Sequence, residues 1–195
     1  MFMEEISTRP ATIDRWHDLQ DVLNGGGDGK SCQCMWPVMQ GVQWRTCSVE
    51  ERRSALHDEV ASGPAPGIIA YVDGVPAGWV RVGPRPHQRR LEKSRIVKAG
   101  SREPFEEAGV WAITCFSIRR EYRRTGLTAT LIRAAVEYAK NGHAATIEAY
   151  PVDNREAKTS SASLFVGPAT TFLHEGFSIV AHPTPNRVVV SLTCL

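Results

Sequence analysis

A chain of 195 residues is long enough for one domain with a sizeable hydrophobic core. Its hydrophobic content of 42%, charged content of 23% and formal net charge of +2 are ordinary for a globular protein and give no bulk signature of a nucleic-acid-binding protein. The first residues lack the basic region and apolar run of a signal peptide, and no stretch approaches the length of a membrane-spanning segment. We therefore expect a single domain over residues 1–195, located in the cytoplasm, without a membrane partner and with its five cysteines as free thiols.

The N-terminal quarter has the pattern of two helices. Thr12 can cap a helix whose apolar residues recur at spacings of three and four up to Leu23, and residues 24–27 (Asn-Gly-Gly-Gly) end it. A loop is expected from there to the second helix. Residues 48–51 (Ser-Val-Glu-Glu) have the form of a capping box, which predicts a helix from there to about Ala61.

A β-hairpin and a basic segment follow. The apolar runs 68–72 and 77–82 flank Asp73-Gly74, and an Asp-Gly pair between two such runs is a strong hairpin signal. Residues 84–108 are polar and irregular. Their basic part, 85–95, indicates a solvated loop, with contact to an acidic substrate or to a ribose phosphate as the alternative.

The second half of the chain reads as a strand–helix–strand unit. Residues 110–118 form a nearly continuous apolar run, typical of a buried strand, and residues 127–139 have the periodicity of an amphipathic helix. Asn141-Gly142 ends that helix, and residues 144–150 form the next strand. Such a unit places its two strands parallel, with a right-handed crossover.

The C-terminal segment predicts a short helix and a strand pair. Residues 151–163 resemble a loop, Pro168 can begin a helix that ends at Gly176, and residues 177–181 and 188–192 form the final strands. The expected fold class is α/β, with a mixed central sheet and helices on both of its faces.

The turn before the third helix breaks a local preference. A helix N-terminus carries partial positive charge, yet this one is preceded by four arginines, Arg119, Arg120, Arg123 and Arg124. Gly126 removes a side chain where a backbone would approach an anion closely, and Thr125 and Thr128 add hydroxyl donors. These residues predict a phosphate or pyrophosphate site. The alternative is a solvated basic turn with a glycine that merely begins a helix.

At these residues the chain resembles the GNAT superfamily of N-acetyltransferases. The pyrophosphate loop of that family has the form Gln/Arg-x-x-Gly-x-Gly/Ala, and residues 123–128 (Arg-Arg-Thr-Gly-Leu-Thr) match it. Residues 116–123 are similar to the strand end and turn that precede the loop, and residues 172–177 (Phe-Leu-His-Glu-Gly-Phe) are similar to a later aromatic-x-x-x-Gly-Phe segment. The resemblance covers residues 110–180 and implies the GNAT acyltransferase fold, in which two parallel strands splay apart.

The resemblance also implies acetyl-coenzyme A (acetyl-CoA) as acyl donor, with no metal. The loop amides would bind its pyrophosphate, and backbone groups of the preceding strand would bind its pantetheine arm and stabilise the oxyanion. The cofactor residues implied in this way are Phe116, Ser117, Ile118, Arg123, Arg124, Thr125, Gly126, Leu127, Thr128, Ala129 and, on a looser match, Asn154.

Two positions depart from the family pattern. The last Gly/Ala of the loop is Thr128, which narrows the approach and adds a donor. Many family members protonate the leaving thiolate with a tyrosine four residues before the Gly of Gly-Phe, and here that position is Phe172. The usual general acid is therefore absent or supplied from elsewhere.

Two residues of the strand over 144–150 are the candidates for proton transfer. An alkylammonium substrate must lose a proton before it attacks, and Glu148 is the candidate base because a carboxylate in an apolar strand is costly unless paired or functional. Tyr150 lies on the same face and is the candidate acid. The structural alternatives are a Glu148 that faces solvent or pairs with a lysine, and a Tyr150 that packs its ring and bonds its hydroxyl nearby.

The cysteines do not indicate a metal site. Cys32 and Cys34, with Cys47 and His57, are spaced too tightly and incompletely for a standard zinc site, so buried or edge thiols are expected. Cys115 lies in an apolar strand and is expected in the core. A covalent acetyl-cysteine route lacks a histidine placed by the sequence to activate the thiol.

The function expected is transfer of an acetyl group from acetyl-CoA to a primary amine, by direct attack in a ternary complex. The acceptor is a small-molecule or a protein amine, because a fold does not settle the substrate. Nucleic acid is not an expected partner, and a homodimer is compatible with this reading. The rival functions are a CoA-binding module without catalysis, motivated by Phe172, and nucleic-acid binding through the basic residues 85–102.

Overall fold

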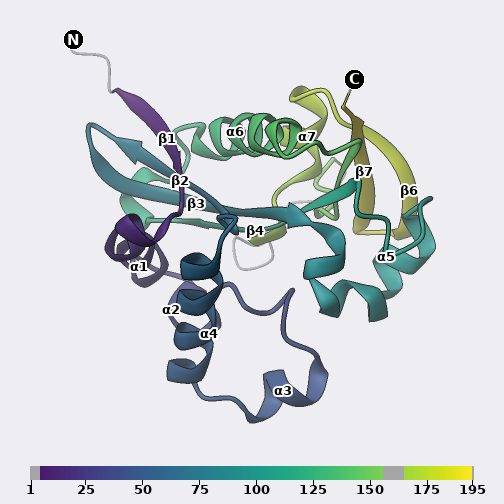
Figure 1. Ribbon diagram of the computed structural model, residues 1–195. Coiled ribbons are helices and arrows are strands. Elements are labelled where there is room, and N and C mark those ends of the chain that lie inside the picture. The colour runs from purple at the N-terminus through teal and green to yellow at the C-terminus, as the bar shows by residue number, and fades with distance from the viewer. Residues whose placement is uncertain (1–4, 156–164, 195) are drawn as a thin grey trace.

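The computed structural model describes residues 5–155 and 165–194. In these residues seven strands form one sheet in the order β1-β2-β3-β4-β5-β7-β6 (Figure 1). Neighbouring strands are antiparallel except β4 and β5, which are parallel, as the strand–helix–strand pattern predicted. The strands are β1 (Ile6–Pro10), β2 (Gly67–Val72), β3 (Val75–Pro84), β4 (Val110–Ile118), β5 (Thr146–Ala149), β6 (Ser178–Thr184) and β7 (Arg187–Thr193).

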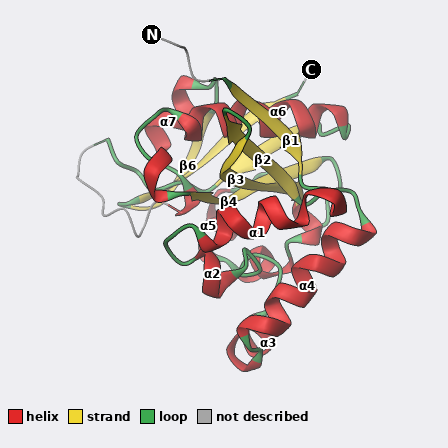
Figure 2. Cartoon of the chain, turned by 90° about the vertical axis from the view of Figure 1, so that its left-hand side faces the viewer, coloured by secondary structure: helices red, strands yellow, loops and turns green. Residues whose placement is uncertain are grey.

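Helices cover both faces of the sheet (Figures 1 and 2). One face carries α6 (Leu127–Asn141) and α7 (Ala169–His174), and the other carries the helices that precede β2, together with α5. The helices that precede β2 are α1 (Trp16–Asn24), α2 (Gly29–Cys32), α3 (Gly41–Thr46) and α4 (Val49–Ser62), and α5 spans Arg95–Gly100. Short 3-10 turns lie at η1 (Ile13–Arg15), η2 (Arg85–His87), η3 (Arg89–Lys93) and η4 (Arg120–Tyr122).

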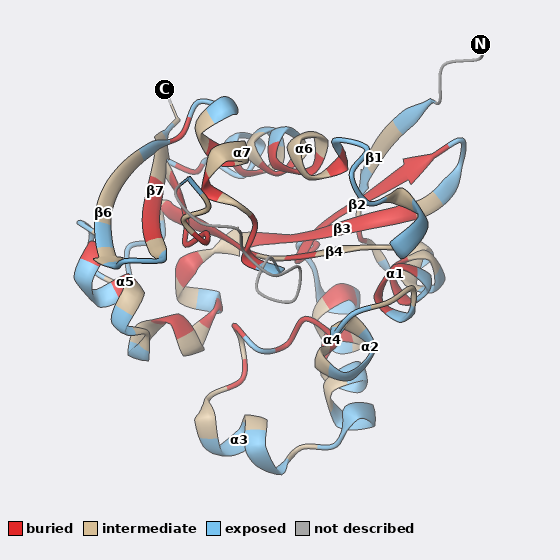
Figure 3. Ribbon diagram, turned by 180° about the vertical axis from the view of Figure 1, so that it is seen from behind, coloured by how far each residue is buried: buried red, intermediate tan, exposed pale blue. Residues whose placement is uncertain are grey.

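The sheet separates two main hydrophobic clusters, and its central strands hold many of the buried residues (Figure 3). On the α6 face, Leu131, Ile132 and Ala135 pack against β2, β3 and β4. On the opposite face, Leu19, Leu23 and the fully buried Trp79 belong to the second cluster, with residues of α4. The 3.6-residue period of α6 places its apolar stripe on the sheet, as the sequence predicted.

Local sequence signals at two turns are confirmed. The Ser48 hydroxyl accepts a hydrogen bond from the Glu51 amide (3.2 Å), and the Glu51 carboxylate accepts one from the Ser48 amide (2.6 Å), which completes the capping box of α4. Asp73 and Gly74 both have positive φ, 48° and 77°, which suits the tight turn between β2 and β3.

Two segments expected to be irregular contain helices. The stretch between α1 and α4 holds α2 and α3, and residues 84–108 hold η2, η3 and α5. Packing explains α2: a Cβ on Gly29 would lie 2.7 Å from the Leu23 carbonyl and 3.1 Å from the Ser117 hydroxyl, so this helix sits directly on β4. Such short helices depend on tertiary contacts rather than on their own periodicity. The loop predicted over 151–163 falls partly outside the described residues.

Candidate active site

Strands β4 and β5 separate half-way along β4. Their parallel pairing ends where Ile113 meets Ala149, whereas β4 continues to Ile118. After β5 the chain leaves this pairing, and Val152 forms isolated bridges elsewhere. Among the described residues, the second half of β4 therefore has no strand paired along the edge that faced β5.

A bulge at Thr114 marks the point where the strands separate. The pairing of β4 with β3 shifts there, so that Thr114 has no partner of its own. Gln88 holds the bulge: its amide nitrogen donates to the Ala112 carbonyl (2.9 Å), and its oxygen accepts from the Thr114 hydroxyl (2.6 Å). Bulges of this kind re-aim the backbone beside active sites.

The backbone of β4 beyond the bulge presents donors to the open edge. The Arg119 amide donates to the Ala77 carbonyl (3.0 Å), on the β3 side. Because donors alternate between the two edges of a strand, the amides of Phe116 and Ile118 are directed to the other edge. These are two of the residues that the sequence resemblance assigned to the cofactor, and Ser117 lies between them.

The turn between β4 and α6 exposes a row of unpaired amides. Arg124 (φ 67°) and Gly126 (φ 84°) are both left-handed. In the described part of the chain, no hydrogen-bond acceptor meets the amides of residues 124–128. A Cβ on Gly126 would have no atom within 4 Å, so the space above this turn is open. The row of amides and the dipole of the fifteen-residue α6 make a site for an anion.

The arginines of this turn leave much of their charge available. Arg119 pairs with Glu121 (2.6 Å) and donates to the Pro76 carbonyl (2.9 Å). Arg120, Arg123 and Arg124 are exposed and form no ion pair with any residue that the structure describes. Unpaired cations beside unpaired amides raise the local positive potential, which favours a multiply charged anion such as a diphosphate.

The glycines that follow α1 lie against this arginine turn. The Gly25 carbonyl accepts from the Arg120 amide (3.4 Å), and a Cβ on Gly25 would lie 2.3 Å from Arg119. A Cβ on Gly26 or Gly27 would approach the Arg123 guanidinium to 3.6 Å. The sequence indicated these glycines only as the end of a helix. Their close approach to residues almost a hundred positions later could not be inferred from local pattern.

Glu148 lies in a buried polar network on the face opposite α6. Its side chain is almost fully buried and accepts hydrogen bonds from Arg85 (2.9 Å), the Ser101 hydroxyl (2.7 Å) and the Tyr150 hydroxyl (2.8 Å). Arg85 is itself fully buried and also contacts Ser101 and the carbonyl of Pro104. Glu148 is therefore paired with a cation, but this cation is an arginine rather than the lysine of the structural alternative, and Glu148 does not face solvent. Arg85 comes from the basic segment that was expected to be a solvated loop.

Tyr150 shares this network. Its side chain is buried, and burial together with the neighbouring Glu148 carboxylate raises its pKa well above the ordinary value for a phenol. The hydroxyl therefore keeps its proton at neutral pH and donates a hydrogen bond to the Glu148 carboxylate. The sequence prediction that both residues share one face of the strand is consistent with this contact.

Comparison with known proteins decides the family. The sequence profile of the acetyltransferase (GNAT) family matches residues 32–159, about two thirds of the chain. The chain belongs to the acetyltransferase (GNAT) family. No curated protein matches the sequence significantly.

Solved GNAT structures share the fold over nearly the whole chain. PaiA N-acetyltransferase from Thermoplasma acidophilum, in complex with coenzyme A, is 12% identical with a TM-score of 0.55, covering 97% of this chain and 99% of that one. YncA from Salmonella typhimurium, with its cofactor acetyl-CoA, is 12% identical with a TM-score of 0.55, covering 97% and 94%. An N-acetyltransferase from Staphylococcus aureus Mu50 is 11% identical with a TM-score of 0.55, covering 98% and 99%. At such identities the likeness establishes the fold, and the chain is a GNAT-family acyltransferase by its profile.

Phe172 fills the position where many GNAT enzymes have a tyrosine. Its ring is fully buried and meets Phe116 (centroids 6.0 Å apart) and Phe177 (5.2 Å) edge to face. It has no polar atom and lies within the core of the α6 face. This residue therefore packs the site and cannot donate a proton.

Asn154 lies beyond β5 and holds the start of α7. Its side chain donates to the Thr170 hydroxyl (3.0 Å) and accepts from the Thr170 amide (3.2 Å). This contact connects the loop after β5 to the helix that carries Phe172. The first turn of α6 contains the other implied cofactor residues, with Leu127 buried and Thr128 and Ala129 partly exposed.

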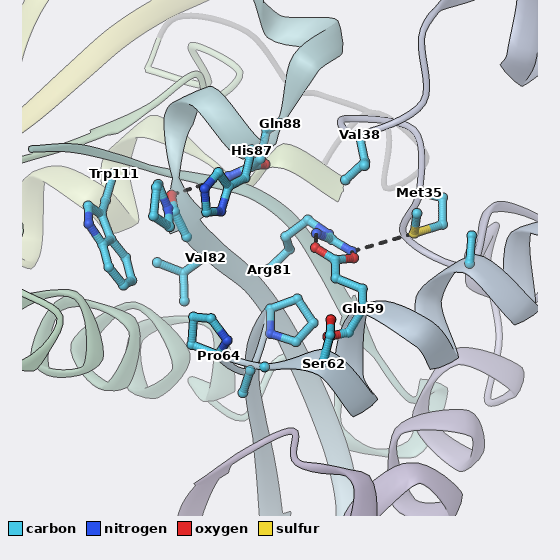
Figure 4. A pocket seen from close by; sticks show the side chains of 16 residues that line it. Met35, Val38, Glu59, Ser62, Pro64, Arg81, Val82, His87, Gln88 and Trp111 are labelled. Carbon is cyan, nitrogen blue, oxygen red and sulfur yellow. Dashed lines mark hydrogen bonds and ion pairs between the residues drawn. The ribbon is translucent and has the colours of Figure 1, made fainter. Parts of the chain in front are cut away.

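A cavity of about 320 Å³ opens beside β3 on the face that carries α4 (Figure 4). Arg81 and Glu59 meet at its floor as a bidentate ion pair (2.9 and 2.8 Å), and Arg81 also points at the Met35 sulfur (3.6 Å). His87 and Trp111 lie on the far side of the cavity from Met35. In the ladder between β3 and β4, Arg81 lies opposite Cys115, so the cavity begins next to the strand that borders the open edge.

The described residues contain no group of three His, Cys, Asp or Glu side chains arranged to hold a metal ion. No helix in the described ranges combines the length and the apolar character needed to cross a bilayer.

Proposed function

We propose that this GNAT protein transfers an acetyl group from acetyl-CoA to a primary amine by direct attack in a ternary complex. The observation that carries the proposal is the row of unpaired amides over residues 124–128, flanked by exposed arginines at the N-terminus of α6. The GNAT profile and the two similar structures that contain CoA or acetyl-CoA support the choice of donor.

The pyrophosphate of acetyl-CoA would lie above Gly126. The amides of residues 124–128 would donate to its oxygens, and Arg123 and Arg124 would neutralise its charge. The hydroxyl of Thr128, on the first turn of α6, is a further donor, while that of Thr125 already donates to the Tyr122 carbonyl (2.8 Å). Ala129 completes the turn.

The pantetheine arm would run along the open edge of β4 toward the bulge. The backbone N–H of Ile118 would donate a hydrogen bond to a carbonyl of the arm, in the way that an added strand pairs with a sheet edge. The amide of Phe116 would donate to the thioester carbonyl, where negative charge develops during attack. Removing one donor of this kind typically lowers kcat by about 100- to 1,000-fold.

The acceptor would approach from the face that carries α1, α2 and α4. Glu148 and Tyr150 are on that side of β5, and we propose that they transfer protons. Glu148 would accept the ammonium proton through its hydrogen-bonded partners, and the Tyr150 phenol would return a proton to the leaving thiolate of CoA. Arg85 keeps the carboxylate fixed in this position. A small-molecule amine is the proposed acceptor, since the similar structures include N-acetyltransferases and the adjacent cavity has the size of a small-molecule site.

The proposal is tested in two stages. Calorimetry with acetyl-CoA and with free CoA measures donor binding, and release of the CoA thiol is then followed with a panel of primary amines. Binding together with amine-dependent thiol release is the expected result. Absence of binding would sink the proposal.

The second candidate is a CoA-binding module without catalysis, and the buried Phe172 is the observation that favours it. It predicts tight donor binding with no thiol release for any amine in the panel.

A further inference from the structure

Two cysteines from distant parts of the chain meet beside the proposed thioester site. Cys34 follows α2 and is 1% exposed, and its sulfur accepts a hydrogen bond from the Trp79 indole N–H (3.1 Å). Trp79 and Arg81 lie on the same face of β3, and Arg81 lies opposite Cys115 in the ladder between β3 and β4. Cys115 packs against the buried cluster that contains Cys34 and Trp79, so the two cysteines lie in the same part of the core.

The charges around this thiol pair favour a thiolate at Cys34. Burial alone would raise the pKa of Cys34, but hydrogen bonding from the Cys115 thiol and the nearby Arg81 cation, with the Trp79 N–H, lower it to about 7. The same hydrogen bond and burial raise the pKa of Cys115 well above its ordinary value. At neutral pH a large fraction of the molecules therefore has a thiolate at Cys34 beside a thiol at Cys115.

The backbone at Cys34 is held in an unusual conformation. Gln33 (φ 48°) and Cys34 (φ 53°) are two successive residues with side chains in the left-handed region, which is rare and costly for residues other than glycine. The buried side chain of Gln33 holds the turn: its oxygen accepts a hydrogen bond from the Gln20 side chain (2.9 Å), and its nitrogen donates one to the Lys30 carbonyl (2.9 Å). In this conformation the Cys34 sulfur is buried against Trp79 of β3 rather than directed toward solvent.

The cavity beside β3 lies close to the pair. The cavity of about 320 Å³ is lined by Met35, the next residue after Cys34, and by Arg81 (Figure 4). Cys115 itself is partly exposed. Because Cys34 is only 1% exposed, a small oxidant such as hydrogen peroxide is expected to reach the pair more readily than a bulky thiol reagent.

We propose that Cys34 and Cys115 form an oxidisable pair whose disulfide is a modification site within the acetyl-CoA-binding strand. The Cys34 thiolate attacks one oxygen of hydrogen peroxide, the O–O bond breaks, and hydroxide leaves, which produces a sulfenic acid at Cys34. The Cys115 thiol, losing its proton, then attacks the Cys34 sulfur, and the S–O bond breaks with release of water. Each pair of cysteines oxidised thus reduces one peroxide to two waters.

The disulfide would disturb the proposed thioester site, and this part of the inference rests on the proposed function. Cys115 lies between the bulge at Thr114 and Phe116, whose amide would hold the thioester carbonyl. A disulfide is about 2 Å long, much shorter than a thiol–thiolate hydrogen bond, so β4 or the turn at Cys34 must shift. A misplacement of about 1 Å at reacting groups lowers rates by as much as about 100-fold.

The chemical step is tested on the reduced full-length protein without any activity assay. The protein is treated with a small excess of hydrogen peroxide, the remaining thiols are alkylated, and the unreduced digest is analysed by mass spectrometry. The expected product is one cross-linked peptide pair containing Cys34 and Cys115, with Cys47 and Cys194 alkylated. A cross-link of Cys34 to Cys32, or complete alkylation of Cys115, would overturn the proposal.

Variants separate the two roles in the pair. In Cys115→Ser the sulfenic acid at Cys34 has no resolving thiol, so Cys34 accumulates as sulfinic acid, whereas Cys194→Ser, on the other side of the sheet, leaves the cross-link unchanged. Oxidation of the wild-type protein should lower acetyl-CoA affinity or turnover at least about tenfold, and a reductant should restore it. If the cross-link forms with affinity and turnover unaltered, its proposed effect on the site is wrong. If it forms in a protein that turns over no amine, the thiol chemistry stands and the proposed transferase activity fails.

Discussion

Replacing Gly126 by valine tests the anion site most directly. Gly126 has a φ of 84° and a Cβ there would meet no atom within 4 Å, so a side chain is accommodated sterically but occupies the space above the unpaired amides. We expect the Gly126→Val variant to fold and to lose acetyl-CoA binding.

The expected magnitudes have two separate sources. A side chain in the left-handed region costs about 1–2 kcal/mol, which lowers the Tm of a chain of this length by about 2–8 °C. If the isopropyl group displaces the pyrophosphate from two of the amides, the loss is about 1.5–3 kcal/mol for each charged hydrogen bond. The affinity for acetyl-CoA should then fall by more than about 100-fold.

Gly74 provides a matched control. It has a similar φ of 77°, its Cβ would also meet nothing within 4 Å, and it lies in the exposed turn between β2 and β3. The Gly74→Val variant should show a similar fall in Tm but unchanged affinity, measured by calorimetry with acetyl-CoA. Equal affinities of the two variants would refute the assignment of the anion site to Gly126.

Three further predictions concern the buried network, the core and the pH dependence. Glu148→Gln leaves the buried Arg85 without its anion, so urea denaturation should show a free energy of unfolding lower by about 3–5 kcal/mol. Adding Arg85→Gln should restore part of this loss. The pH profile of turnover should also change in Glu148→Gln. Phe172→Tyr places a hydroxyl in the core between two rings, so stability should fall by about 1–3 kcal/mol with no gain in turnover. Hydrogen bonding from Arg155 lowers the pKa of Asp153 to about 2 from 3.8, so the contribution of Asp153 to the free energy of unfolding is complete above pH 3.8 and is lost as the pH falls through 2. Asp153→Asn should remove this part of the pH dependence of stability. The same loss of stability with falling pH in the variant and the wild type would contradict the prediction.

The elements that local pattern determines were predictable. The hairpin at Asp73-Gly74, the capping box at Ser48 and the strand–helix–strand unit around α6 each follow from turn chemistry or from a clear period, and the structure confirms them. The turn that we propose binds the pyrophosphate was found for a different reason: its arginines oppose a helix dipole, and a violated preference indicates a functional position.

Long-range partners were not predictable. Arg85 and Glu148 are 63 positions apart, and nothing in the basic segment distinguishes the fully buried Arg85 from its more exposed neighbours Arg89 and Arg90. The cysteine pair was equally hidden, because Cys34 reaches β4 only through α2, a helix too short to show a period. Contacts of this kind depend on which elements become neighbours in the sheet, and a single sequence does not encode that locally.

The loss of the family tyrosine and the presence of Tyr150 are connected by position. Phe172 lies on α7, packed into the core of the α6 face, where a hydroxyl would need a polar partner that the surrounding rings do not supply. Tyr150 lies at the end of β5, where the strands separate, and its hydroxyl already has a carboxylate acceptor in Glu148 at 2.8 Å. A proton donor held at that point can approach the thioester from the acceptor side instead of from α7. Under the proposed function, Tyr150 would supply the proton that the apolar residue at position 172 lacks. Tyr150→Phe should then lower turnover while leaving acetyl-CoA affinity unchanged.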